Sequence, residues 1–229
     1  MLGSGYNVRR VGQIVWVDLT KSEEDLLENI SKEGRKKLRQ AESRGVEVKM
    51  LPPDGFSDFI PLYRETMEHH LANERYLYPD VFFENMMRTP EEFCFVMGAF
   101  VEEQLVSSVI VLAGGEVGYS YLSATNRDFQ NYRPNNYLFW KMLRKCKQMG
   151  LKYFVLGGGA AGNDGTYKFK LNFSSLEKDF YIFDRLHDPE TYKRIIEIKT
   201  EFEHTQGRLD FDPTSIGFFP IYRCNWRNE

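Results

Sequence analysis

The alternation of apolar and polar residues predicts a series of short strands. Residues 13–19 and 46–50 place an apolar side chain at every second position, which is the period of a strand with one buried face. Residues 153–156 form a short apolar run bounded by glycine, as expected of a strand inside a sheet. In all, the pattern predicts strands at residues 13–19, 46–50, 93–101, 105–112, 118–122, 153–156 and 179–183.

Apolar residues at spacings of three and four predict helices between these strands. Residues 56–72, for example, carry Phe59, Tyr63 and Met67 at intervals of four. Asn135 and Asn136 are expected to cap a strong helix that follows them. A first helix is predicted after an N-cap at Thr20 or Ser22, with Leu26, Leu27 and Ile30 on one face. Further helices are predicted at residues 31–44, 56–72, 81–87, 137–149 and 189–204.

The order of these elements predicts an α+β fold with a mixed, mostly antiparallel sheet and helices on both faces. The three middle strands are joined by hairpin turns at Glu102-Glu103 and Gly114-Gly115, so they should pair antiparallel. No stretch has the composition of a linker, so we expect one domain over residues 1–229. Its core is predicted to span residues 14–205, with an aromatic tail at residues 206–229.

A glycine-rich bend follows the predicted strand at residues 153–156. Gly157 and Gly158 allow the backbone to turn sharply and allow another group to approach it closely. Beyond the bend, Lys168 and Lys170 flank Phe169. Because chemistry often collects at such bends, this segment is the candidate site of the chain.

Composition and charge narrow the class of protein. The chain is 42% hydrophobic and 28% charged, and no apolar run reaches the ~18 residues of a membrane span. With no signal-like start, we expect a cytoplasmic protein. The net charge of -3 argues against a general nucleic-acid binder. The basic segment at residues 31–44 is either a solvated helix face or a surface for phosphates.

The cysteines and histidines predict neither a disulfide framework nor a metal site. The three cysteines are far apart, form no CxxC pair and have no histidine cluster beside them. The histidines form no recognisable arrangement with serine and aspartate, so a covalent route is unsupported. The three cysteines are Cys94, Cys146 and Cys224.

Five segments in series resemble the Fem-type aminoacyltransferases of peptidoglycan bridges, which belong to the GNAT superfamily. The most specific is the Phe-Lys-x-x-Phe segment at residues 165–173 (GTYKFKLNF), which follows the glycine pair of residues 150–158 (GLKYFVLGG). The other segments are residues 35–48 (RKKLRQAESRGVEV), 75–83 (RYLYPDVFF) and 133–140 (RPNNYLFW). The resemblance covers about residues 14–205. It implies a GNAT-like acyltransferase fold that is similar to the second of the two halves of a Fem protein.

The resemblance also implies roles for individual residues. Lys170 matches the lysine thought to stabilise a developing oxyanion, whereas Lys168 is expected to be solvated. Arg75 falls where the family places an arginine on substrate phosphates, a role that suits a guanidinium.

Further residues are expected around these two. Tyr76 and Tyr78 either line a groove or fill the core, and Tyr119 and Tyr121 share a strand face that borders the cleft in this fold. The substrate-binding set predicted from the sequence is Arg75, Tyr78, Tyr119, Tyr121, Asn135, Gly157, Gly158 and Phe169.

The donor is predicted from the segment before the central helix. GNAT enzymes bind the pyrophosphate of acetyl-CoA on a glycine-bearing loop there, but residues 125–136 contain no glycine. This loop argues against acetyl-CoA as donor. The resemblance to the Fem type implies aminoacyl-tRNA as donor, with no bound cofactor, and a cell-envelope precursor amine as acceptor. An acyl-CoA-dependent enzyme and a non-catalytic interaction module stay open as alternatives, and a homo-oligomer is compatible with the sequence.

Overall fold

The structure, a computed structural model, describes residues 7–72, 76–159, 164–216 and 219–224. The chain divides into two compact units. The larger unit is residues 12–179, and the smaller unit combines residues 1–11 with residues 180–229. The expectation of a single domain stays a prediction, because the compactness of a unit does not measure whether it folds on its own.

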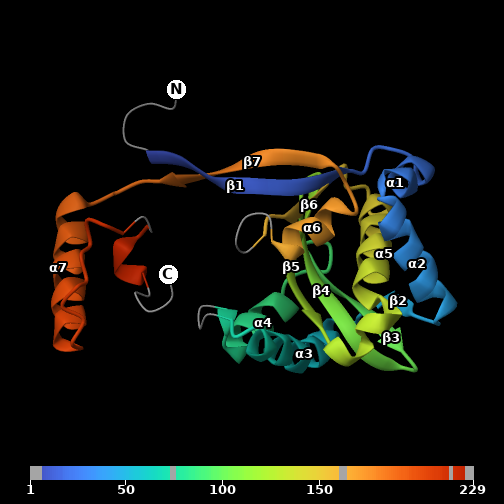
Figure 1. The fold of residues 1–229 in the computed structure, drawn as a ribbon, viewed down its shortest axis with the longest axis horizontal. Helices are drawn as coiled ribbons and strands as arrows, with labels where there is room; N and C mark the ends of the chain where they lie inside the picture. Colours follow the sequence, from blue (N-terminus) through green and yellow to red (C-terminus); the bar gives the residue numbers. More distant parts are fainter. Residues whose placement is uncertain (1–6, 73–75, 160–163, 217–218, 225–229) are drawn as a thin grey trace. The chain divides into compact units, whose positions relative to one another are not determined.

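The predicted α+β class is confirmed (Figure 1). The strands are β1 (Asn7–Asp18), β2 (Glu47–Met50), β3 (Cys94–Val101), β4 (Gln104–Gly114), β5 (Val117–Thr125), β6 (Tyr153–Gly157) and β7 (Leu176–Asp184). The helices are α1 (Glu23–Asn29), α2 (Lys32–Ser43), α3 (Phe56–His69), α4 (Asp80–Met87), α5 (Pro134–Gln148), α6 (Gly165–Leu171) and α7 (Pro189–Thr205). Short 3-10 helices are η1 (Pro53–Gly55), η3 (Arg127–Tyr132) and η4 (Ile221–Arg223).

The described strands form one mixed sheet in the order β2-β3-β4-β5-β6-β1-β7. The pairs β2–β3, β3–β4, β4–β5 and β1–β6 are antiparallel. The pair β5–β6 is parallel, because α5 lies between these strands in the chain and carries it back across the sheet. The hairpins predicted from Glu102-Glu103 and from the glycines at 114–115 are the antiparallel connections of β3, β4 and β5.

Two cores lie on opposite faces of the sheet in the larger unit, and β3 contributes to both. Phe95 and Met97 pack into the core beneath α2 and α5, whereas Cys94 and Val96 pack into the core beneath α3 and α4. This alternation is the two-residue period of a strand that is buried on both faces. Figure 1 shows α2 and α5 on one side of the sheet and α3 and α4 on the other, as the sequence predicts.

Several predicted boundaries are wrong. Among the strands, β1 begins at Asn7 and not at residue 13, and β7 begins at Leu176 and not at residue 179. The helix expected over residues 56–72 ends at His69, where Leu71 adopts a positive φ of 47°. The cap predicted at Asn135 and Asn136 is also wrong, because α5 begins at Pro134 and its N-cap is Arg133 in the left-handed region. Proline suits the first helical position since it has no N–H to leave unpaired there. Asn135 therefore lies inside the first turn.

The smaller unit is organised around α7. The ring of Tyr192 stacks on Phe219 at 5.7 Å and meets Tyr222 edge-on at 5.9 Å. Phe211 is 3% exposed. Phe219 and Tyr222 of the predicted tail thus pack on α7. In the same unit Arg9 pairs with Asp184 at 3.0 Å.

Candidate functional site

The predicted lysine lies on α6, whose position is fixed at both ends. The side chain of Asp164 accepts a hydrogen bond from the Tyr167 backbone N–H at 2.8 Å, so it caps the N-terminus of α6. Phe169 and Phe173 both contact the Phe139 ring of α5, with centroids 5.1 and 5.8 Å away. These two phenylalanines therefore pack α6 and the residues that follow it onto the core.

The glycine pair and Lys170 meet at the end of β6. The Lys170 ammonium donates a hydrogen bond to the Gly158 carbonyl oxygen over 2.7 Å. A Cβ on Gly157 would lie 3.3 Å from the same nitrogen, and Gly157 has a φ of +85°, which favours glycine. A Cβ on Gly158 would lie 2.8 Å from the Gln13 carbonyl oxygen of β1. Both glycines are therefore required where β1, β6 and α6 converge.

Burial distinguishes Lys170 from Lys168. Lys170 is half-buried, whereas Lys168, on the same helix, is exposed. Burial lowers the pKa of Lys170 below its ordinary value, and the nearby Asp164 carboxylate raises it in part. An ammonium in such a place is attracted to any oxygen that gains negative charge beside it, since little water screens the interaction.

The pairing of β5 with β6 ends close to this lysine. The parallel register runs from Val117–Tyr153 to Tyr119–Val155 and includes no later pair among the described residues. Both strands continue beyond it, and Gly157 follows Val155 by two residues. Two parallel strands that separate leave backbone groups unpaired between them, so this is where a substrate backbone or carbonyl has access to the sheet.

Tyr119 and Tyr121 are both exposed on β5, at 44% and 41%. Tyr119 pairs with Val155 and so lies next to β6. The register shifts opposite Tyr121, because Ile110 pairs with Leu122 and the next residue of β4, Val111, with Ser120. Tyr121 therefore occupies a β-bulge, a feature that redirects a side chain.

Tyr78 lies near Tyr121 but is packed among other rings. Phe82 of α4 stacks on Tyr78 at 4.2 Å and lies 6.4 Å from the Tyr121 ring. Tyr78 also stacks with the buried Tyr63 at 6.4 Å. The sequence left two alternatives for Tyr78, which were lining a groove and filling the core. The structure places it among packed rings, and its role in binding substrate stays a prediction. The Tyr76 carbonyl accepts a hydrogen bond from the Tyr63 hydroxyl at 2.8 Å.

Asn135 belongs to a buried polar cluster and not to a helix cap. Its side-chain oxygen accepts hydrogen bonds from the hydroxyls of Thr125, at 2.7 Å, and Ser107. Ser107 is fully buried on β4, and the Thr125 N–H donates to the Thr66 hydroxyl of α3 at 3.0 Å. The cluster ties the first turn of α5 to β4, β5 and α3.

The structure thus brings some predicted residues together and leaves others apart. Lys170, Gly157 and Gly158 are in contact, Phe169 supports their helix, and Tyr119 lies on the neighbouring strand. Arg75 falls outside the described residues.

Sequence reasoning missed two contributors. One is Asp164, which caps α6 and raises the pKa of Lys170. The sequence pattern that could have identified it is an aspartate three residues before Tyr167, which is buried. The other is Asn172, whose side-chain oxygen accepts from the Ser31 hydroxyl at 2.7 Å and so joins α6 to the start of α2. No local pattern announces that second contact, because it spans 141 positions of the chain.

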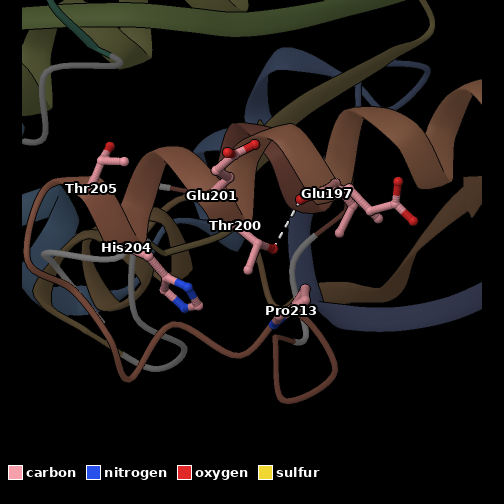
Figure 2. A pocket seen from close by; sticks show the side chains of 7 residues that line it. Glu197, Thr200, Glu201, His204, Thr205 and Pro213 are labelled. Carbon is pink, nitrogen blue, oxygen red and sulfur yellow. Dashed lines mark hydrogen bonds between the residues drawn. The ribbon is translucent and has the colours of Figure 1, made fainter.

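Neither of two hollows in the described residues contains a predicted site residue. The larger, of about 580 Å³, is an open groove between α7 and Pro213 in the smaller unit (Figure 2). Its polar lining is Glu197, Thr200, Glu201, His204 and Thr205. The smaller, of about 30 Å³, lies between Leu51 and Met87. The candidate site is therefore defined by Lys170 and the separating strands.

Two features are absent from the part of the chain that the structure describes. No three His, Cys, Asp or Glu side chains there are grouped to hold a metal ion. None of the helices in those residues combines the length and the apolar character of a membrane span. The cysteines are buried thiols, and burial raises the pKa of Cys94 to about 11 and that of Cys146 to about 12.

Comparisons with known proteins agree with this fold. No curated protein matches the chain. The crystal structure of FemX superposes with a TM-score of 0.67 at 14% identity, over 85% of this chain and 66% of FemX. The C-terminal domain of a putative lysylphosphatidylglycerol synthetase from Agrobacterium fabrum superposes with a TM-score of 0.56 at 12% identity. The superposition covers 85% of this chain and 65% of that domain. L-PGS from Bacillus licheniformis superposes with a TM-score of 0.52 at 16% identity, over 84% of this chain and 66% of L-PGS.

These likenesses are of fold, and the chain spans just under two thirds of each of the three solved structures. The predicted resemblance to the Fem type is confirmed at that level. A family model described as an acetyltransferase (GNAT) domain matches residues 29–170, which is more than half of the chain and includes Lys170 at its end. The chain therefore belongs to the GNAT acetyltransferase domain family.

Proposed function

We propose that the chain is a Fem-like N-acyltransferase that moves an aminoacyl or acyl group to an amine, with Lys170 stabilising the oxyanion. The observation that carries this is the half-buried Lys170 ammonium, 2.7 Å from the Gly158 carbonyl oxygen where β5 and β6 separate. The likeness of fold to FemX and L-PGS favours an aminoacyl donor.

The reaction needs few groups of the protein. The acceptor nitrogen attacks the carbonyl carbon of the donor, a C–N bond forms, and the carbonyl oxygen becomes negatively charged. The Lys170 ammonium, which holds one hydrogen bond to Gly158, donates another to this oxygen. Collapse of the intermediate breaks the bond to the leaving oxygen or sulfur. The proton lost by the amine goes to water or to the substrate's own groups, and that leaving atom takes up a proton.

The position of Lys170 suits a donor to an oxyanion better than a surface lysine does. One N–H is engaged by a backbone carbonyl, so the ammonium is already oriented before substrate binds. The partial burial that lowers its pKa also strengthens its attraction to a negative oxygen. Asp164 opposes that lowering, so it helps to keep the ammonium charged.

Substrates are proposed from the fold and the predicted residues together. The donor is aminoacyl-tRNA, and the acceptor is an amine of a cell-wall or other cell-envelope precursor in the cytoplasm. Tyr119, Tyr121 and Gly157 line its path between the strands. Arg75 binds substrate phosphates, so Arg75→Ala should raise KM more than it lowers kcat. The role of Asn135 in this scheme is to hold the start of α5 through Ser107 and Thr125.

The test uses two lysines of the same helix. Lys170→Met should lower kcat by about 100-fold or more, as expected when an oxyanion donor is removed. The matched control Lys168→Met, at an exposed position of α6, should keep its activity. A donor screen by mass spectrometry with charged tRNAs and acyl-CoAs supplies the assay. Equal turnover by both variants would remove Lys170 from the mechanism.

The pH dependence gives a second readout. Because burial lowers the pKa of Lys170, kcat should fall as the pH rises through a value below 10.5. Asp164→Asn keeps a capping oxygen but removes the charge that raises this pKa, so the fall should begin at a lower pH. An unchanged profile would mean that Lys170 does not act as an ammonium.

An acyl-CoA donor is the second candidate, because the matching family model is described as an acetyltransferase domain. Calorimetric titration of the chain with CoA and with aminoacyl-tRNA separates the two donors. Saturable heat with CoA alone would replace the aminoacyl donor by acyl-CoA. No transfer from any donor, with a folded protein, would favour a non-catalytic interaction module.

A further inference from the structure

One face of α7 is covered by the chain that follows it. Tyr192 lies against Phe219 and Tyr222, and Glu203, at 1% exposed, pairs with Lys199 at 2.5 Å. Lys199 follows Tyr192 by seven positions, and Glu203 follows Lys199 by four. These spacings place the three residues in one stripe along the helix. The groove of Figure 2 is lined by other residues of α7, among them Thr200 and His204.

An apolar stripe lies on the other side and is exposed. Ile195 is 36% exposed, Ile198 58% and Phe202 53%. Their spacings of three and four residues are those of a coiled-coil seam. Large apolar side chains in such a row favour a partner, because their burial releases about 25 cal/mol for each Å² removed from water.

The charges that border this seam decide what the partner is. Arg194 and Glu201 are exposed, and neither has an ion-pair partner among the described residues. They are seven positions apart, which is about 10.5 Å along one line of the helix, on the edge of the seam away from Lys199. Glu190, four positions before Arg194, is also exposed on this edge, so the edge carries a negative, a positive and a negative charge in order.

Such an edge is complementary to itself when two copies of the helix run antiparallel. Arg194 of each helix then faces Glu201 of the other, while Ile195 meets Phe202 and Ile198 lies at the centre of the pair. In a parallel pair Arg194 would face Lys199, a like charge, twice. In the antiparallel pair the like-charge contact is Lys199 with its own copy, and each Lys199 is already paired with Glu203. The pattern selects a second copy of this chain and one orientation.

We propose that two copies associate through an antiparallel pairing of α7 about a two-fold axis. The inference does not depend on the proposed function. The seam has only three large apolar residues per helix, so the contact is small and the dimer dissociates readily in the micromolar range.

The test is sedimentation velocity of the full chain over a range of concentrations. The wild type should shift from monomer to dimer as the concentration rises through the micromolar range. Ile198→Asp should remain monomeric throughout. Because Ile198 is exposed, this variant should keep the circular dichroism spectrum and melting temperature of the wild-type monomer.

A charge exchange tests the orientation. Arg194→Glu and Glu201→Arg should each weaken the dimer by about tenfold, since each replaces two attractive pairs by repulsive ones. The double variant should restore the wild-type affinity. Lys193→Glu and Glu197→Arg are matched controls at exposed positions away from the seam and should leave the affinity unchanged.

Three outcomes would overturn the proposal. One is a monomer at every concentration with a lower melting temperature for Ile198→Asp, which would mean that the chain itself covers the stripe. The second is a dimer that Ile198→Asp leaves intact. The third is a double charge variant no tighter than the single variants.

Discussion

The helices α5 and α7 are similar in length but differ in what covers them. α5 has 15 residues, of which nine are buried. α7 has 17 residues, and among those described Glu203 is the buried one. Both helices are amphipathic. An apolar stripe indicates that one face of a helix will be covered, but it does not identify the element that covers it. The sheet covers α5, and the stripe of α7 is exposed within its own unit.

The two helices also begin differently. The first turn of α5 is held by hydroxyls of Ser107 and Thr125 that donate to Asn135. The first turn of α7 is capped on the surface, where Asp188 accepts from the Thr191 N–H at 3.0 Å. The hydrogen bond from the Thr191 side chain lowers the pKa of Asp188. One helix start depends on distant segments, and the other on its own next three residues.

The largest expected difference is in the cost of removing an apolar side chain. Leu138→Ala on α5 deletes a side chain that is fully buried and should lower the free energy of unfolding by about 3 kcal/mol. Ile198→Ala on α7 should change it by less than about 0.5 kcal/mol, because Ile198 is 58% exposed. Urea titrations followed by circular dichroism, at concentrations below the dimer range, measure both.

A smaller difference concerns the polar anchor of α5. Asn135→Ala leaves the buried Ser107 hydroxyl and the Thr125 hydroxyl without this acceptor and should cost about 1.5 kcal/mol. Asn131→Ala, on the 3-10 helix just before α5, is the control and should cost less than about 0.5 kcal/mol. Equal losses for the two variants would contradict the anchoring role of Asn135.

The elements of the sheet could be predicted because their signals are local. The two-residue alternation of β2 and the unbroken apolar run of β3 both indicate strands. The predicted cap of α5 failed because Arg133 adopts a positive φ, which is unusual for a side chain of its size. Asparagine is a common cap, so propensity favoured the wrong residue, and the proline at position 134 was the stronger signal.

The candidate site could be predicted in part for the same reason. Gly157, Gly158 and Lys170 lie within fourteen positions, so a bend followed by a short helix brings them together. The partners of Asn135 could not be predicted, because Ser107 is 28 positions away on β4 and meets it only once the sheet has formed. The bulge at Tyr121 likewise depends on the register with β4.

The smallest expected effect tests the one buried charge described on α7. Burial raises the pKa of Glu203, but the hydrogen bonds and charges of Lys199 and Arg208 outweigh burial and hold the pKa below 4.5. In the unfolded chain this carboxylate takes up its proton at a higher pH than in the folded chain. Its contribution to stability is therefore present above about pH 4.5 and is lost as the pH falls through the folded value.

Glu203→Gln keeps an acceptor for Lys199 and Arg208 but removes the charge, and it should cost about 1 kcal/mol at pH 7. Hydrogen exchange of the α7 amides, followed by mass spectrometry, should show faster exchange in this variant at pH 7. As the pH falls below 4.5, the protection of wild-type α7 should fall toward that of the variant, because protonation removes the same charge. Glu197→Gln, at an exposed position of the same helix, is the control and should follow the wild type. Wild-type protection that does not fall with acidification would mean that packing of Tyr192 against the aromatic tail alone holds α7 in place.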